Sequence, residues 1–348
     1  MQKKDLLGMN PGDIQHQIAD LELPGFATRE IALWIYRRGA TSCNEFTNLS
    51  KSVRKHLDER FFISRHNPVK VNTSSDGTKK YLFRTMESGF IETAYIPEGK
   101  RHTLCLSSQV GCKIGCLFCM TARQGFQGHL SSAQIVNQVM SIPENEQLTN
   151  LVFMGMGEPF DNTESVIKAL HILTADWGLS FNPKKITVST VGLIPGMVKF
   201  IEESRCQLAI SLHSPFDQER ALLIPVENIY PIKEVMETLK KYDWHKQRRI
   251  SFEYIVFKGL NDSPRHINQL ARLLNGIRCR INLMHFHSIP NSTLKGASEE
   301  ELINFRDRLN RKGLTATIRA SRGEDILAAC GLLSTKEINQ ENTQIASD

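Results

Sequence analysis

The chain has no run of about 18 consecutive apolar residues, so it contains no candidate for a membrane-spanning helix. Its first five residues, Met1 to Asp5, are polar and are not those of a secretory signal peptide. Eight cysteines among 348 residues are too few for a disulfide-stapled scaffold. No internal repeat or low-complexity tract stands out. We therefore expect a soluble protein of the cytoplasm with no membrane contact, in a compartment where thiols stay reduced.

What the sequence does contain is enough apolar material for one large core and a smaller accessory unit, since 41% of its residues are hydrophobic. The net charge of +6 is compatible with a polyanionic partner but does not require one. Basic stretches such as Arg37-Arg38 and Lys184-Lys185 could contact phosphates, although such stretches are more often simply solvated.

The pattern of apolar residues divides the chain into four parts. Helical spacing predicts an N-terminal helical accessory domain over residues 1–65, which would contact RNA if the chain binds it. Alternating residues around a polar turn predict a β-hairpin extension over 66–100. From 101 to 333, strands alternate with amphipathic helices, which predicts a parallel sheet forming a barrel or partial barrel. The polar residues 334–348 are expected to form a loosely ordered tail.

In this main domain the predicted elements follow one another as strand and helix. The strands are a first one near Thr103–Ser107, then Asn150–Met154, Lys185–Thr190, Gln207–Leu212, Ile250–Val256, Ile281–His287 and Thr315–Arg319. The helices are Ser132–Ile142, Thr163–Trp177, Ile232–Tyr242, Arg265–Leu274 and Glu299–Lys312. Functional residues of such folds lie at the C-terminal ends of the strands.

The most informative local feature is the spacing C-x3-C-x2-C formed by Cys112, Cys116 and Cys119. Thiolates are soft ligands that suit iron–sulfur clusters, which usually take four cysteines. Three ligands in one loop would leave one iron of a [4Fe–4S] cluster open to a substrate or cofactor, as in catalytic metal sites. The alternatives are a zinc site completed by a distant residue, or accidental clustering.

Small or polar residues follow three successive predicted strands. Gly157-Glu158-Pro159 comes after the first, Ser189 lies at the end of the second, and Ser211-Leu212-His213 ends the third. Glycines let a ligand approach the backbone, and the Glu158 carboxylate could accept hydrogen bonds from a cationic amine. Each segment alone is also an ordinary strand exit. Their recurrence favours a single small-molecule pocket.

These features together resemble the radical S-adenosylmethionine (SAM) superfamily, in which C-x3-C-x2-C precedes a glycine-rich G-E-P segment. Within that superfamily the chain resembles the RlmN/Cfr family of RNA adenine methyltransferases over roughly residues 12–333. Thr121-Ala122 and Gln124-Gly125-Phe126 are similar to the RlmN branch rather than the Cfr branch. The similarity is carried by the stretches 103–112, 153–159, 211–213 and 323–331, and by Pro24-Gly25-Phe26 and Trp34-Ile35-Tyr36.

The resemblance implies a fold and two cofactors. The fold would be a partial (β/α)6 radical SAM barrel of the TIM type, in the α/β class. Cys112, Cys116 and Cys119 would hold a [4Fe–4S] cluster whose open iron binds SAM, and two SAM molecules would be used per turnover. The residues that would bind SAM are Gly157, Glu158, Ser189, Ser211, Leu212, His213 and His287.

The resemblance also assigns three catalytic residues. Cys330 would be methylated by one SAM, and its methyl group, activated by a radical from a second SAM, would add to the adenine ring. Cys105 would then attack the sulfur of Cys330 and release the product, leaving a disulfide. Glu92 would accept the ring proton. Without the resemblance, each of these is more readily read as a structural residue.

The implied function is methylation of C2 of adenosine 2503 in 23S rRNA and of adenosine 37 in some tRNAs. The target base would have to leave its stack to reach a protein sulfur. A low-potential electron donor such as flavodoxin would be a partner, and the protein would act as a monomer. Two alternatives remain: methylation of adenine C8, as in Cfr, or a non-catalytic RNA-binding protein with a structural metal.

Two positions depart from the family pattern. His287 stands where the family has an asparagine that contacts SAM, and Leu332 follows Cys330-Gly331 where the family usually has glutamine. An imidazole can donate to the same acceptor as an amide, but its geometry and titration differ.

Overall fold

The structure, a computed structural model, describes residues 3–85, 89–244 and 250–335. A ten-stranded sheet forms its centre, in the order β14-β13-β12-β11-β10-β9-β6-β5-β4-β3. The strands from β6 and β9 to β14 are parallel, and those from β3 to β6 are antiparallel. The strands are β3 (Lys70–Thr73), β4 (Lys79–Arg84), β5 (Phe90–Glu98), β6 (Arg101–Cys105), β9 (Asn150–Phe153), β10 (Ile186–Thr190), β11 (Gln207–Ser211), β12 (Ile250–Ile255), β13 (Cys279–Met284) and β14 (Ala316–Ile318).

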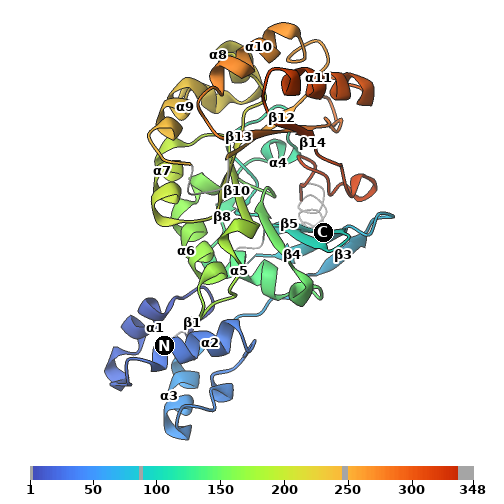
Figure 1. Cartoon of the computed structure of the whole chain (residues 1–348). Helices are drawn as coiled ribbons and strands as arrows, with labels where there is room; N and C mark the ends of the chain where they lie inside the picture. The colour runs from blue at the N-terminus through green and yellow to red at the C-terminus, as the bar shows by residue number, and fades with distance from the viewer. Residues whose placement is uncertain (1–2, 86–88, 245–249, 336–348) are drawn as a thin grey trace.

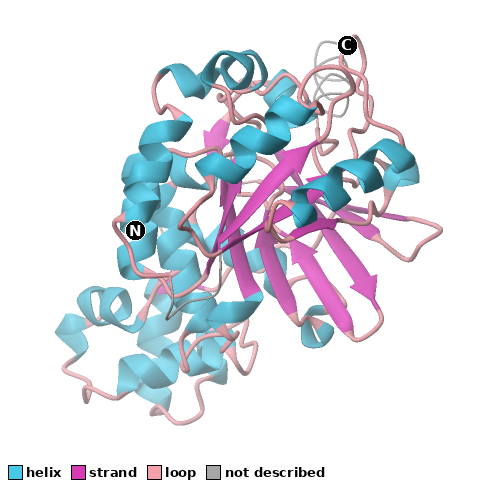
Figure 2. Ribbon diagram, turned by 45° about the horizontal axis from the view of Figure 1, so that its top comes forward, coloured by secondary structure: helices cyan, strands magenta, loops and turns pink. Residues whose placement is uncertain are grey.

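Helices follow one another in an arc around the outside of the parallel strands (Figure 1), and Figure 2 shows the sheet curving behind them. The two edge strands, β14 and β3, do not pair with each other, so the curved sheet is not closed. It is therefore an open, partial barrel, as the sequence predicts. The helices of this layer are α5 (Ser132–Met140), α6 (Thr163–Thr174), α7 (Ile194–Glu203), α8 (Asp217–Leu223), α9 (Ile232–Lys240), α10 (Pro264–Leu273) and α11 (Glu299–Arg311). The short helix α4 (Met120–Gln124) lies inside the arc (Figure 1).

The two faces of the sheet have different surroundings because side chains alternate along each strand. In β10, Ile186 and Val188 are fully buried in the hydrophobic core. Thr187, between them, is half-buried and lines a cavity on the concave face. One face of the sheet thus packs under the helices, and the other is available for a ligand.

The N-terminal helices form a lobe beside α5 and α6 (Figure 1). Its attachment is close: Ser132 Oγ donates to the Gly8 carbonyl at 2.9 Å, and a Cβ at Gly8 would lie 2.4 Å from the Ala133 nitrogen. Lys168 of α6 forms an ion pair with Asp13 at 2.8 Å. The lobe consists of β1 (Lys4–Asp5), α1 (Pro11–Gln17), α2 (Ala27–Tyr36), α3 (Lys51–Arg60) and β2 (Phe61–Phe62).

All seven predicted parallel strands are present, including β14, which extends the expected six-strand arrangement by one short strand. The predicted hairpin over 66–100 contains a third strand, β5, and joins the main sheet because Ala94 of β5 pairs with Cys105 of β6. Of the predicted tail 334–348, Ser334 and Thr335 are hydrogen-bonded to Gln124, and 336–348 lie outside the described residues. Among the helices that the structure describes, none has the length and apolar character needed to cross a membrane.

Candidate active site

The loop that carries the three motif cysteines lies past the C-terminal end of β6. It follows β7 (Gln109–Val110), which pairs with β8 (Gly128–His129). Gly111 opens the loop at φ +72°, and a Cβ there would lie 1.6 Å from the Gly125 carbonyl oxygen. Only glycine fits this approach. The loop then packs on an apolar cluster that includes Val191, Leu223 and Phe257.

The cysteines of the loop have the chemistry of a cluster ligand set. Burial raises the pKa of Cys112 to about 12, and burial also raises the pKa of Cys116, with Cys119 and Cys112 adding to the effect. Within the described residues, no three His, Cys, Asp or Glu side chains converge closely enough for one metal ion. Each thiolate of a [4Fe–4S] cluster binds a different iron, so the three sulfurs need not converge on one point. Three cysteines in one loop are a donor set that fits such a cluster.

Glu158 is held at the C-terminal end of β9 by backbone groups. Its oxygens accept hydrogen bonds from the amides of Phe160 and Val191, both at 3.0 Å, and its own amide donates to Gln109 Oε1 at 2.8 Å. Burial raises the pKa of Glu158 to about 7, although these hydrogen bonds lower it. Gly157 lies at φ +97° with Gln109 where a side chain would be. The carboxylate therefore has a fixed position but retains lone pairs for a cationic ligand.

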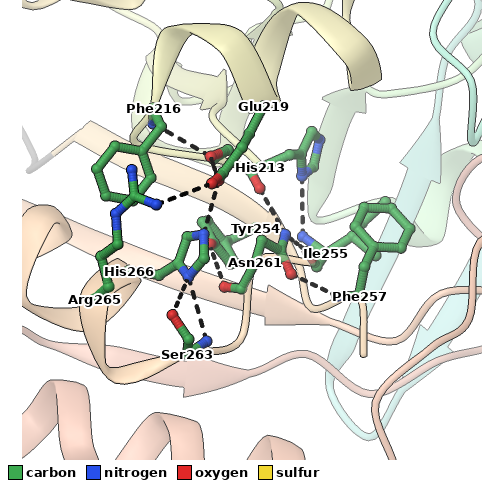
Figure 3. Close-up of polar contacts among 11 residues, drawn as sticks. His213, Phe216, Glu219, Tyr254, Ile255, Phe257, Asn261, Ser263, Arg265 and His266 are labelled. Carbon is green, nitrogen blue, oxygen red and sulfur yellow. Dashed lines mark hydrogen bonds and ion pairs between the residues drawn. The ribbon is translucent and has the colours of Figure 1, made fainter. Parts of the chain in front are cut away.

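His213 connects the end of β11 to the cysteine loop. Its Nδ1 accepts a hydrogen bond from the Ile255 amide at 2.9 Å, which leaves the proton on Nε2, and its carbonyl accepts from Asn261 at 2.6 Å (Figure 3). Burial lowers the pKa of His213 to about 3, so the ring is neutral at physiological pH. Phe118, between Cys116 and Cys119, packs edge-on against this ring with centroids 4.7 Å apart.

One residue of this region, Arg220, has no signal in the sequence. It is fully buried on α8 and pairs with Glu227. Its guanidinium donates to the carbonyls of Val191, Ser211 and Leu212 at 2.6 to 3.0 Å. Arg220 thereby fixes the ends of β10 and β11, next to Ser189 and within Ser211-Leu212-His213. A single arginine in an amphipathic stretch gives no hint of such burial.

A cavity of about 1160 Å³ follows the concave face of the sheet and brings three further predicted residues together. Cys105 on β6, Cys330 and His287 all line it, although they come from distant parts of the chain. Cys105 is buried and Cys330 is exposed. Burial raises the pKa of Cys105 to about 12, with a further increase from Cys330 and a decrease from Arg319. The two thiols are therefore electrostatic neighbours.

The segment that carries Cys330 is attached to the cysteine loop. The Met120 amide donates to the Gly331 carbonyl at 2.8 Å, and Thr121 Oγ1 donates to the Leu333 carbonyl at 2.7 Å. Met120 and Thr121 directly follow Cys119, and Gly331 directly follows Cys330. The short helix α4 thus joins the candidate cluster loop to the candidate methyl carrier.

Glu92 and His287, two other predicted residues, are each held by polar neighbours. Glu92 on β5 is not among the residues that line the cavity; its oxygens bind Lys80 at 2.8 Å and the Ser334 amide at 2.9 Å. Burial raises the pKa of Glu92, which favours a proton acceptor, although Lys80 lowers it. His287 lies 2.9 Å from Ser321 Oγ and 3.6 Å from Glu324, and burial lowers its pKa. The imidazole of His287 is thus held by the segment leading to Cys330.

Two family models match the chain: that of the radical SAM superfamily over residues 106–273, and that of the N-terminal domain of ribosomal RNA large subunit methyltransferases over residues 4–63. A protein of Bacteroides thetaiotaomicron described as a probable dual-specificity RNA methyltransferase RlmN is 53% identical over 98% of this chain and 99% of its own length. The dual-specificity RNA methyltransferase RlmN of Syntrophus aciditrophicus is 42% identical over 98% and 99%.

A solved structure agrees with these sequence relatives. The radical SAM methyltransferase from Sphaerobacter thermophilus superimposes with a TM-score of 0.86 at 37% identity, covering 95% of this chain and 99% of that one. Among the features on which the resemblance rested, Cys105 and Cys330 line one cavity, and the segment after Cys330 is hydrogen-bonded to the end of the cysteine loop. The chain belongs to the RlmN family of radical SAM RNA methyltransferases.

Proposed function

We propose that this protein methylates C2 of adenosine 2503 in 23S rRNA and of adenosine 37 in some tRNAs, through an S-methyl group on Cys330 and a covalent RNA adduct. The observation that carries the proposal is that Cys330 and Cys105 line one cavity while the segment after Cys330 is bonded to the cysteine loop. A protein that only bound RNA would have no use for two thiols in one cavity next to the loop that would hold the cluster.

The cofactors fit the residues at the C-terminal ends of the strands. Cys112, Cys116 and Cys119 would hold the [4Fe–4S] cluster, and Glu158 would accept from the SAM amine. Ser189, Ser211, Leu212 and His213 would contact the rest of SAM. When bound and reduced by a donor such as flavodoxin, the cluster would supply the electron that cleaves SAM to methionine and a 5′-deoxyadenosyl radical.

The thiols of the chain would carry the methyl group. The Cys330 thiolate would attack the methyl carbon of a first SAM and displace S-adenosylhomocysteine, and the S-methyl group so formed would then lose one hydrogen atom to the radical from a second SAM. The resulting methylene carbon would bond to adenine C2, and the adduct would then give up one electron, for which the cluster oxidised in the cleavage of SAM is the acceptor, and the C2 proton, which would go to Glu92. The Cys105 thiolate attacks the Cys330 sulfur and forms a disulfide, and the released carbon takes a proton to become the product methyl group.

The other end of the cavity is suited to RNA. Basic residues surround it where the strands begin, which is the end opposite to the SAM-binding residues. Their positive charge would attract the phosphates on either side of an extruded adenosine. These residues are Lys100, Arg101, Lys184, Lys185, Arg278 and Arg280.

The substrate can be identified by mass spectrometry of rRNA and tRNA from a strain that lacks this protein. We expect 2-methyladenosine to disappear from both RNAs and to return with the wild-type gene. Retention of 2-methyladenosine in the deletion strain would refute the substrate assignment. Loss of 8-methyladenosine instead would show that C8 is the target.

The cluster assignment can be tested without any activity measurement. Protein purified without oxygen should be brown and contain about four irons per chain. Cys116→Ala should be colourless and nearly iron-free, because a buried ligand is lost from the loop. Cys206→Ala, which removes an equally buried cysteine elsewhere, should keep both iron and colour. Colourless wild-type protein that binds zinc after reconstitution would favour a structural metal.

A further inference from the structure

Glu253, on β12, has a carboxylate oxygen with no partner. Its side chain is 3% exposed and lines the cavity that contains Cys105 and Cys330. Oε1 accepts hydrogen bonds from Ser251 Oγ at 3.0 Å and from Asn282 Nδ2 at 2.8 Å. Oε2 is buried and accepts none. An unsatisfied buried acceptor costs free energy, so its presence at a cavity wall points to a ligand that donates to it.

Arg319 faces the same cavity and also has no charged partner. It follows β14, where its amide donates to the Leu283 carbonyl at 2.8 Å, and its Nη1 reaches Met154 Sδ on the far side of the cavity at 3.1 Å. In the part of the chain that the structure describes, no carboxylate lies within ion-pair distance of this guanidinium. A thioether is a weak acceptor, so most of the five N–H donors of Arg319 remain available.

The register of the sheet places Glu253 and Arg319 on the same face, where both line the cavity. Glu253 pairs with Asn282 of β13, and Asn282 pairs with Thr317 of β14, two residues before Arg319. The backbones of β12 and β14 are therefore about 10 Å apart, which leaves room for a planar ring between a short and a long side chain. Burial lowers the pKa of Arg319, but Cys330, Glu253 and Cys105 outweigh this effect and raise it. Arg319 is thus an electrostatic neighbour of both Glu253 and the methyl-carrying thiol.

We propose that Glu253 and Arg319 recognise the edge of the target adenine, with Glu253 accepting a hydrogen bond from the N6 amine and Arg319 donating one to N1. Adenine presents a donor at position 6 and an acceptor at N1, whereas guanine presents an acceptor at position 6 and a donor at N1. The pair is complementary to adenine and opposed to guanine. C2 is bonded to N1, so this placement holds C2, and not C8, on the side of Arg319 and Cys330. A guanidinium at N1 also withdraws electron density from the carbon that is attacked.

The proposal rests on the proposed function, because it takes adenine as the substrate, and RNA analogues test it separately. The probe is an RNA hairpin that copies the stretch of 23S rRNA around adenosine 2503, with binding measured by fluorescence anisotropy. Purine riboside at the target position lacks the N6 amine, and 7-deazaadenosine lacks only N7. We expect wild-type protein to bind the purine riboside RNA about 10- to 100-fold more weakly than the adenosine RNA, and to bind the 7-deazaadenosine RNA normally.

Glu253→Gln makes the test specific to this residue. Because Ser251 and Asn282 donate to the Oε1 position, the amide oxygen takes that place and the amide NH2 replaces the unpartnered oxygen. A donor then faces the N6 amine, and the preference for adenosine over purine riboside should fall to about twofold or less. Glu98→Gln, which changes another carboxylate of the same cavity, should keep the full preference.

Equal binding of the two RNAs by wild-type protein, or a full preference in Glu253→Gln, would overturn the proposal. The outcome is independent of methyl transfer. If the wild-type enzyme methylates no adenosine, the proposed function fails. If it methylates adenosine but ignores the N6 amine, only the assignment of Glu253 and Arg319 fails.

Discussion

Cys330→Ala should reduce methylation of RNA by at least about 10³-fold, because the substitution removes the sulfur that we propose carries the methyl group. The side chain is exposed at the cavity wall, so its truncation to alanine should have little effect on folding. Cluster content and cleavage of SAM should remain, since the residues proposed to bind the cluster and SAM are untouched. The measurement is methyl transfer to rRNA and tRNA with purified, reconstituted enzyme.

A matched variant and a second readout show whether the loss is chemical. Cys279→Ala changes a half-buried cysteine at the start of β13 and should stay within a few-fold of wild type. Mass spectrometry of the peptide that contains residue 330 should show one added methyl group in wild-type protein and none in the variant. Methylation by Cys330→Ala at more than a tenth of the wild-type rate would disprove a methyl carrier at this position.

The architecture of the main domain was predictable because its strands carry a local signal. Stretches such as Asn150–Met154 and Ile250–Val256 are short, apolar and separated by single amphipathic helices, which leaves a parallel sheet as the consistent solution. The cysteine motif could also be recognised in the sequence, since its three cysteines lie within eight residues of one another. These features need only information from neighbours in sequence.

Helix α7 shows how the demands of tertiary packing can make the local sequence untypical of a helix. Its first turn reads Ile194-Pro195-Gly196, which is typical of a loop, and the sequence predicted no helix there. Proline is well tolerated in the first turn of a helix. Glycine is required because a Cβ at position 196 would lie 2.5 Å from Thr163 Oγ1 and 2.6 Å from the Phe160 Cβ. The residues that impose the glycine are more than thirty positions away in the chain.

The buried charged residues of the site could not be predicted from the sequence either. Arg220, Glu253 and Arg319 have ordinary sequence neighbours, and their roles depend on which carbonyls or cavities the fold places beside them. Cys105 and Cys330 were identified through resemblance to a family rather than through their spacing. Side chains that act across a sheet leave no period or motif in the sequence, and only the three-dimensional structure reveals them.

Cys105→Ala should convert the enzyme into one that attaches RNA to itself and does not release it. Cys330 remains free to be methylated and to bond to the adenine, but no thiol is left to attack its sulfur. Up to about one RNA per protein should therefore become covalently bound under turnover conditions, visible as a band of reduced mobility on a denaturing gel. Multiple turnover should fall below detection, because each molecule stops after one addition.

The double variant Cys105→Ala/Cys330→Ala is the control, and it should form no adduct because the carbon that would bond to adenine is absent. Only attachment through Cys330 predicts this pattern; trapping that survived in the double variant would place the bond elsewhere. Absence of any adduct in the single variant would instead exclude Cys105 as the resolving thiol.

Because Cys105 is buried and its pKa is raised to about 12, release in the wild-type enzyme requires that its thiolate be stabilised.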